Sequence, residues 1–474
     1  MASLENALAE SNRLLAESHA QNAALIEQVT KLTARIDQLL EQLGQNSKNS
    51  HKPPSSDGPG SRGSGSSGKK KSRSGRKAGG QKGHKGSHRE LLPVDEVDAF
   101  VEIYPELCLG CGASLASRFD DARRYQQLDI RDHRPHVTEF RRHEVSCERC
   151  GHRTLAPFDR AVIPASPFGP CLTAVVALLT GVYHLSRRKA QQLLAELFGI
   201  SISIGAISAM ERRASEALKS AYDEAQHEVE YAAVKHTDAT SWVRAGVLMS
   251  LWTLATTSAT VFRIFADGCR ETIRPFFGDR HGILVSDRAT VFGFWVMSLR
   301  QICWAHLLRK FIAFSERDGP AAALGYELLE YTALAFDYWR GFQEGALTRE
   351  ELEIWLRPVR RGFERALERG ADAEIDRVSG ACADMLAHRE ALWTFVANEG
   401  VEPTNNHAER ELRAFVLWRK RSFGTQSARG ERFAERVMTV AHTARKQGCA
   451  VLAFLTRSIE ANLVGEPTPR LIGT

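Results

Sequence analysis

The sequence has no stretch of about 18 uncharged apolar residues, which is the length that a membrane-spanning helix needs. Residues 1–10 also lack the basic start and the apolar run of a secretory signal. We therefore expect no membrane role and a cytoplasmic chain. In that reducing compartment, its nine cysteines should be thiols or metal ligands rather than disulfides.

Net positive charge is confined to one segment of the chain. The formal net charge is +6, but residues 48–90 hold twelve Lys and Arg against only Asp57 and Glu90, so the remainder is net negative. A local run of cations favours binding to a polyanion, because the binding releases the counterions condensed on that polyanion. Nucleic acid is therefore the leading partner class, with Lys69, Lys70 and Lys71 as candidate DNA contacts, and a solvated linker is the alternative.

The length of 474 residues favours two to four domains. Residues 1–43 carry apolar side chains at alternating spacings of three and four, which predicts a coiled coil that pairs copies of the chain. A lone amphipathic helix is the alternative. The seam consists of Leu4, Leu8, Leu15, Leu25, Val29, Leu32, Ile36, Leu39 and Leu43. Residues 44–90 are rich in Ser, Gly, Pro and Lys and should form a disordered basic linker.

Two Cys-x-x-Cys pairs lie in residues 91–160. They are Cys108 with Cys111 and Cys147 with Cys150. Four thiolates suit a tetrahedral, structural Zn²⁺ ion, and the glycines beside each pair permit the tight turns that such ligands need. A redox dithiol is the alternative, although redox chemistry does not require two separate pairs.

Residues 165–225 have a helical period interrupted at Gly199. Ser203 can cap a second helix that carries Ile204, Ile207, Met210 and Ala214 inward. This pattern favours a helix-turn-helix DNA-binding region, although two short helices around a glycine also occur in any helical subdomain. The first helix carries the candidate phosphate contacts Arg187, Arg188 and Lys189.

Strand patterns begin at Val234. The alternation of this segment predicts that Asp238 lies at a strand end, and residues 247–255 and 259–266 should form a β-hairpin. The apolar run before Asp287 is typical of a buried strand with a polar residue at its carboxyl end. If the two strands are neighbours, the two aspartates meet. Close carboxylates repel unless a cation lies between them, and oxygen ligands select Mg²⁺ or Mn²⁺. Turn formation is the alternative role of each aspartate.

A third carboxylate is then expected, and Glu409 is the candidate. It lies in a polar stretch that opens a helix. The spacing alone leaves two alternatives open, a capping box with Asn406 and an i, i+4 ion pair with Arg413.

Five segments together resemble transposases of the insertion sequence 66 family. They are NSHKPPSSD at 49–57, GGQKGH at 79–84, LVSD at 284–287, CWAHLLR at 303–309 and NNHAER at 405–410. The resemblance covers nearly the whole chain. Two positions depart from the family pattern, Ala239 in place of Glu and Thr404 in place of Asp, and neither is one of the three carboxylates.

The resemblance implies a multidomain α+β protein with a ribonuclease-H-like catalytic domain at 230–445, followed by a C-terminal segment at 446–474. A helical insertion at about 315–400 would contain three helices between 321 and 398. The resemblance also implies an Asp-Asp-Glu triad of Asp238, Asp287 and Glu409 that holds two Mg²⁺ or Mn²⁺ ions. Cys303 and His306 supply only half a zinc site, so we expect them to pack against or support the triad. Basic residues after Glu409 are candidate DNA contacts, namely Arg410, Arg413, Arg419 and Lys420.

The resulting hypothesis is a metal-dependent DNA transposase that binds double-stranded transposon ends and joins them to target DNA. It would act as a homo-oligomer, associate with the nucleoid when bound to DNA, and could work with accessory proteins of the same element. Two alternatives remain open. One is a non-enzymatic zinc and helix-turn-helix regulator, and the other is a ribonuclease-H-like nuclease that cuts without joining.

Overall fold

The computed structural model describes residues 19, 26–28, 31, 90–115, 123–129, 135–157, 164, 166–279 and 281–473. Most of the predicted coiled coil of residues 1–43 therefore lies outside the described residues, and so does the linker with Lys69, Lys70 and Lys71, except Glu90. No helix in the described ranges is both long enough and apolar enough to cross a membrane.

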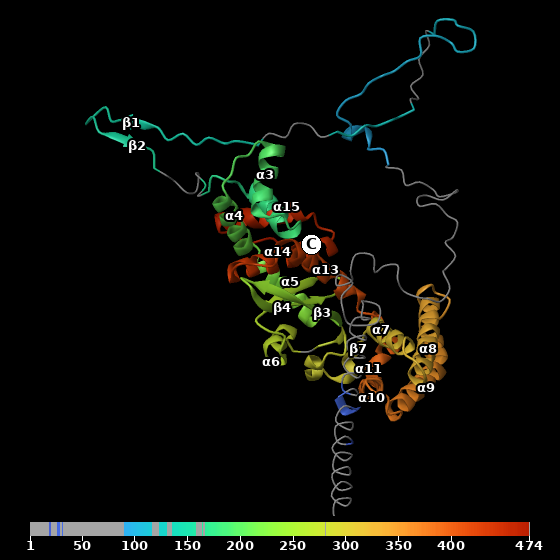
Figure 1. The fold of residues 1–474 in the computed structure, drawn as a ribbon. Coiled ribbons are helices and arrows are strands. Elements are labelled where there is room, and N and C mark those ends of the chain that lie inside the picture. The colour runs from blue at the N-terminus through green and yellow to red at the C-terminus, as the bar shows by residue number, and fades with distance from the viewer. Residues whose placement is uncertain are drawn as a thin grey trace, which may run out of the picture.

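A five-stranded mixed sheet lies in the middle of the fold (Figure 1). Its strands in chain order are β3 (Val234–Arg244), β4 (Val247–Ala255), β5 (Thr260–Phe265), β6 (Ile283–Ser286) and β7 (Arg300–Ile302). The spatial order is β5-β4-β3-β6-β7, in which β3, β4 and β5 are antiparallel neighbours and β3, β6 and β7 run parallel. The predicted hairpin is confirmed, because β4 and β5 pair around a turn at 256–258.

The prediction that Asp238 lies at a strand end is wrong, since β3 continues to Arg244. The reason is that the antiparallel pairing with β4 persists along β3 as far as a tight turn at Ala245 and Gly246, whose φ angles are 48° and 85°. The parallel pairing with β6, in contrast, stops at His236 opposite Val285. Asp238 therefore lies just beyond the point where β3 loses its parallel neighbour.

Four α-helices lie between residue 166 and the sheet. They are α2 (Pro170–Ala177), α3 (Arg187–Phe198), α4 (Ile204–Ala217) and α5 (Lys219–Tyr231), with a π-helical turn η3 (Leu178–Val182) after α2. As predicted, α3 ends at Gly199, whose φ is 64°, and the Ser203 side chain caps α4 by accepting a hydrogen bond from the Ala206 amide. The prediction that the Ile204 side chain points into the core is wrong. This residue is 38% exposed because it occupies the first position of α4, beyond the edge of the core.

Three helices close the chain, α13 (Asn406–Ser422), α14 (Ala428–Lys446) and α15 (Val451–Val464). Helix α14 contacts β5, α4 and α5, while α15 contacts α2 and α4. Buried side chains of the early helices, the sheet and the late helices belong to one hydrophobic core, which includes Ala214, Trp242, Phe433 and Phe454. The helices before the sheet and the helices after it are therefore packed as one unit.

A second core lies within the helices inserted between β7 and α13. They are α7 (Trp304–Ser315), α8 (Pro320–Gln343), α9 (Arg349–Asp372), α10 (Ser379–Ala387), α11 (Arg389–Leu392) and α12 (Thr394–Ala397). Residues 321–398 thus contain two long and three short helices instead of the predicted three, because the chain turns repeatedly after α10 to pack Trp393 and Phe395 inward. Val285 of β6 and Ile302 of β7 belong to this second core.

The remaining elements are short. The strands β1 (Glu144–Ser146) and β2 (Arg153–Leu155) form a separate hairpin. The others are η2 (Val94–Glu96), α6 (Arg270–Ile273), η4 (Arg274–Phe277), η5 (Thr290–Phe294) and η6 (Met297–Leu299).

Candidate active site

Asp238 and Asp287 lie on adjacent parallel strands. The register pairs Val234 with Ile283 and His236 with Val285, and continuing it brings Asp238 level with Asp287, directly after β6. Each carboxylate accepts a backbone hydrogen bond at 2.9 Å, Asp238 from Ala239 and Asp287 from Ala289. The predicted meeting of the two aspartates therefore follows from the sheet.

Glu409 lies in the first turn of α13. Neither alternative that the spacing left open is formed in the described structure. Asn406 is already the first helical residue, so it is not the cap of a capping box, and the ion pairs of the described residues do not join Glu409 to Arg413. The Glu409 carboxylate instead faces α7, where Oε1 lies 3.9 Å from His306 Nδ1 and Oε2 lies 4.0 Å from Arg309 Nη2.

Asn405 fixes the start of α13. Its side-chain Nδ2 donates to the carbonyl oxygen of Thr237 at 2.6 Å, and its Oδ1 lies 3.3 Å from His236 Nδ1. Its own amide donates to the sulfur of Cys303 at 3.1 Å. The helix that carries Glu409 is thus bonded to the strand that carries Asp238, directly before that residue.

The charges of Glu409 and Asp287 act on the carboxylate of Asp238. The pKa of Asp238 is raised to about 7, first by burial and then by the negative charges of Glu409 and Asp287, while the Ala239 amide and Arg309 oppose the change. Burial also raises the pKa of Glu409, again opposed by Arg309. Oε1 of Glu409 is buried and has no hydrogen-bond partner in the described structure. Such a group favours a cation between the carboxylates.

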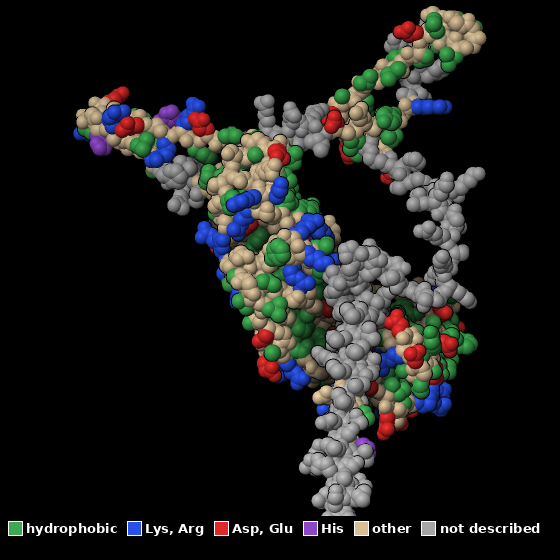
Figure 2. Space-filling view, viewed as in Figure 1, with side chains coloured by type: hydrophobic (Ala, Val, Ile, Leu, Met, Phe, Trp, Pro, Cys, Tyr) green, Lys and Arg blue, Asp and Glu red, His purple; other side chains and the backbone are tan. Residues whose placement is uncertain are grey.

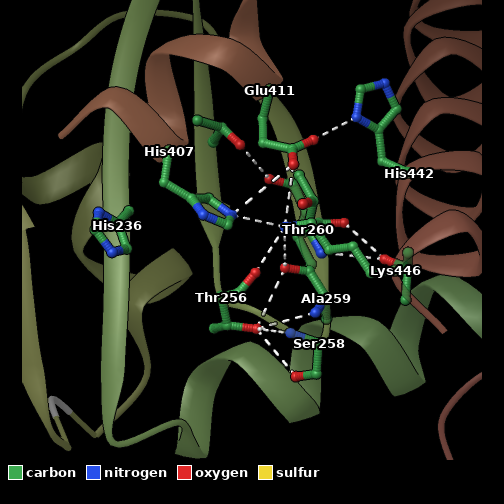
Figure 3. A network of polar contacts seen from close by, with 12 residues as sticks. His236, Thr256, Ser258, Ala259, Thr260, His407, Glu411, His442 and Lys446 are labelled. Carbon is green, nitrogen blue, oxygen red and sulfur yellow. Dashed lines mark hydrogen bonds and ion pairs between the residues drawn. The ribbon is translucent and has the colours of Figure 1, made fainter. Parts of the chain in front are cut away.

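A network of charged side chains supports α13 from its other side. Figure 3 shows Glu411 of α13 meeting His442 and Lys446 of α14. Glu411 Oε2 lies 2.5 Å from His442 Nδ1, and Oε1 lies 3.1 Å from Lys446 Nζ. Burial raises the pKa of Glu411, but these two partners outweigh it and lower the value to about 2. Lys446 also lies 2.8 Å from His407 Nε2 and donates to the carbonyl of Thr256 at 2.6 Å, so α13, α14 and the β4–β5 turn are joined.

The candidate phosphate contacts of α3 differ in their surroundings. Arg187 forms an ion pair with Glu211 of α4, with its Nη2 2.6 Å from Oε2, so its guanidinium holds the two helices together. Arg188 and Lys189 are exposed. Figure 2 shows Lys and Arg side chains gathered over the part of the surface formed by α3, α4, α14 and α15.

The basic residues of α13 also divide into two kinds. Arg410, Arg413 and Lys420 are exposed. Arg419 is partly buried and donates to the backbone and hydroxyl oxygens of Ser241 in β3. Arg419 therefore binds α13 to the sheet.

Each Cys-x-x-Cys pair forms the same turn. The Cys108 amide donates to the Ala113 carbonyl, and the Gly112 amide donates to the Cys108 carbonyl, both at 2.8 Å. Cys147 repeats this pattern between β1 and β2, with its amide bonded to the carbonyl of His152 at 2.8 Å. Amide hydrogen bonds within the turns lower the pKa of Cys108, first from Gly110, and of Cys147, first from Cys150.

The two cysteine pairs do not converge on a common point. Within the described ranges, the group of potential metal ligands whose donor atoms all lie within 4.8 Å of one another consists of Cys303, His306 and Glu409. The two turns have the form that zinc ligands need, but the structure keeps the pairs apart.

Several residues of the site were not singled out from the sequence. Asn405 lies inside the NNHAER segment, yet nothing in its spacing indicates a bond to Thr237. Glu411, His442 and Lys446 are spread over two helices, and only their meeting in space identifies them as a group.

Comparison with known proteins gives two family matches. Residues 165–432 match the model described as Transposase IS66 family, which is more than half of the chain. Residues 5–90 match a family of unknown function (DUF6444). A search of curated proteins finds no match. The region of the first match contains α2 to α13, with the sheet and all three carboxylates. The chain therefore belongs to the IS66 family of transposases.

Proposed function

We propose that the chain is a DDE-type DNA transposase that binds the ends of its insertion sequence, cuts DNA strands there and joins them to target DNA. The observation that carries this proposal is the convergence of Asp238, Asp287 and Glu409 from two neighbouring strands and one helix. Hydrolysis at an element end and attack of the released 3′ hydroxyl on target DNA are both phosphodiester transfers, so one site can perform both.

The three carboxylates would hold Mg²⁺ or Mn²⁺, two ions in all, because hard cations prefer oxygen ligands. When bound, such ions activate the attacking oxygen and stabilise the leaving oxygen of a phosphodiester. The residues fit this role. The pKa of Asp238 is raised by burial and by its two acidic neighbours, and the buried Oε1 of Glu409 has no hydrogen-bond partner in the described structure.

The protein's own contribution is to hold the carboxylates in place. Asn405 bonds the first turn of α13 to β3, so that Glu409 stays beside Asp238. Asp287 is held by the Ala289 amide at the end of a fully buried strand. Positioning of this kind matters because a displacement of about 1 Å can lower a rate about a hundredfold.

We assign residues 230–445 to a ribonuclease-H-like catalytic domain with a helical insertion at 315–400. The mixed sheet, with carboxylates on two adjacent parallel strands and on a later helix, supports this assignment. The position of α7 to α12 between β7 and α13 supports the insertion.

DNA contacts would come from several elements. Arg410, Arg413 and Lys420 are exposed on the helix that carries Glu409, where they could neutralise phosphates near the carboxylates. The capped pair α3 and α4 would act as the helix-turn-helix, with Arg188 and Lys189 as phosphate contacts.

Two further assignments concern the N-terminal half. Residues 91–160 would bind structural Zn²⁺ through Cys108, Cys111, Cys147 and Cys150 once the two pairs, which lie apart in the structure, come together; the matching geometry of the two turns supports this assignment. Residues 1–43 would pair copies of the chain, and the assembly would associate with the nucleoid and with accessory proteins of its element.

The central test is Asp287→Asn in the full chain, assayed on DNA that carries the element's own ends. The amide oxygen can still accept the Ala289 hydrogen bond, so the fold should persist while a negative ligand is lost. Cleavage with Mg²⁺ or Mn²⁺ should disappear while end binding survives. Asp223→Asn, which alters an exposed aspartate of α5, is the matched control and should cut normally.

The same assay separates the alternatives. Cleavage retained by the Asp287→Asn variant would overturn the triad. Binding without any cutting by the native chain would favour a regulator, and cutting without a joined product would favour a nuclease.

A further inference from the structure

Two side chains beside the triad, together with Glu409 of the triad itself, offer a second kind of metal site. The sulfur of Cys303, an imidazole nitrogen of His306 and a carboxylate oxygen of Glu409 all lie within 4.8 Å of one another. Cys303 directly precedes α7, His306 lies in the first turn of α7, and Glu409 lies in the first turn of α13. The sequence provided only the Cys303 and His306 half of this group, and the fold adds the third ligand.

The backbone holds these two helix starts together. The Trp304 amide donates to the Pro403 carbonyl at 2.9 Å, and the Asn405 amide donates to Cys303 Sγ at 3.1 Å. Burial raises the pKa of the Cys303 thiol to about 11, and the amide hydrogen bond from Asn405 to its sulfur opposes this change. Because both segments are bonded to each other, the three donor atoms need only small side-chain movements to reach one ion.

The surroundings of the donor atoms also suit a ligand. Cys303 is fully buried, and the His306 and Glu409 side chains are 13% and 30% exposed. Glu409 Oε1 is the oxygen that faces His306, at 3.9 Å from Nδ1, and it is buried without a hydrogen-bond partner in the described part of the chain. The Glu409 carboxylate that the triad requires therefore faces α7.

The two sets of ligands differ in chemical softness. Asp238 and Asp287 offer only oxygen, which suits Mg²⁺ and Mn²⁺. Cys303 and His306 offer sulfur and nitrogen, which with one carboxylate suit a tetrahedral Zn²⁺ ion that keeps a fourth position open. Glu409 is common to both sets.

We propose that Cys303, His306 and Glu409 bind Zn²⁺, and that this binding draws Glu409 away from Asp238 and Asp287. The thiol of Cys303 gives up its proton to solvent when the metal–sulfur bond forms. The binding itself is independent of the proposed transposase activity, whereas its consequence, inhibition of cleavage with Mg²⁺, rests on that function.

The first experiment measures Zn²⁺ alone. The full-length protein, its Cys303→Ser variant and its His306→Gln variant are dialysed against low Zn²⁺, and the bound metal per chain is determined. The native chain should hold one ion more than either variant. Cys382→Ser is the control, because Cys382 is also fully buried and lies outside this group, and it should match the native chain. Equal zinc contents in the native chain and both variants would overturn the proposal.

The second experiment keeps this inference apart from the proposed function. Asp287→Asn should lose cleavage but keep the additional Zn²⁺ ion, since Asp287 is not one of its ligands. If the native chain cuts DNA with Mg²⁺, Zn²⁺ should inhibit it at least tenfold more strongly than it inhibits a folded His306→Gln variant. Equal inhibition of the native chain and the His306→Gln variant would overturn the competition for Glu409 and leave the triad assignment intact. If neither protein cleaves DNA, that result would count against the triad and not against Zn²⁺ binding.

Discussion

Asn405 donates a 2.6 Å hydrogen bond from its side chain to the carbonyl oxygen of Thr237, the residue before Asp238. Both residues are buried. The bond joins the start of α13 to the middle of the sheet, and Glu409 follows one helical turn later. The relative position of Asp238 and Glu409 therefore depends on this amide.

Asn405→Ala should lower DNA cleavage by about a hundredfold while end binding stays unchanged, because Glu409 loses its fixed position. The variant should also unfold about 1–3 kcal/mol more easily, since the Thr237 carbonyl is left buried without its donor. Cleavage rates and urea unfolding measure the two effects. Asn398→Ala is the matched control, because the Asn398 amide donates to the Thr394 carbonyl at 2.8 Å in the helical insertion. A comparable loss of cleavage in both variants would contradict a specific role of Asn405.

Lys446→Met should destabilise the protein by about 3 kcal/mol, because Glu411 is left largely buried with its negative charge poorly compensated. Lys446 and Glu411 are 13% and 16% exposed, so solvent screens their attraction only weakly. Urea unfolding measures the difference. Lys219→Met breaks an exposed ion pair with Asp223 and should cost less than about 1 kcal/mol. Equal effects of the two substitutions would show that the buried network adds little.

Gly282→Ala should be more harmful than Gly246→Ala. Both glycines have a positive φ, 72° and 85°, so alanine is strained by about 1–2 kcal/mol at either position. At Gly282, a Cβ atom would additionally lie 2.4 Å from the Ala233 carbonyl oxygen, whereas at Gly246 nothing lies within 4 Å. Because Gly282 directly precedes β6, its variant should also lose cleavage through displacement of Asp287. Thermal unfolding and cleavage assays of the two variants test this, and equal losses would rule out the contact with Ala233.

Glu435 should make stability depend on pH. Burial raises the pKa of this α14 side chain to about 7, although a hydrogen bond from the Ile264 amide opposes the change. The folded state therefore holds the proton more tightly than the unfolded state, and the stability from this group is complete below about pH 4.5 and is lost as the pH rises through 7. Glu435→Gln should lose less stability than the native chain between pH 5 and pH 8. Melting temperatures across this range measure the difference, and parallel curves for the two proteins would contradict the raised pKa.

Local signals in the sequence predicted local structure well. Gly199 and Ser203 marked a helix end and a helix cap, and the apolar run before Asp287 gave a buried strand. The position of Asp238 was predicted less well, because the length of β3 depends on pairing with β4 rather than on its own residues. Alternation along one strand cannot reveal which partner continues beside it.

The supports of the site could not be predicted from the sequence. Asn405 and Thr237 are 168 residues apart, and the partners of Glu411 lie on another helix. Such contacts follow from the packing of whole elements, which no spacing encodes. The three carboxylates could be identified from the sequence only because two of them follow strand patterns and the third lies in a segment that resembles the family.

The shared core of the helices on either side of the sheet limits how this protein can be recombined with its relatives. Buried residues of α2, α4, α14 and α15 touch one another although more than two hundred residues of chain separate the pairs, as the bond from Arg436 to Ser215 illustrates over 221 residues. A chimera that exchanged only residues 166–218 would place foreign side chains against native α14 and α15. Exchange of the early helices should therefore give a folded protein only when residues 428–473 from the same donor are transferred with them.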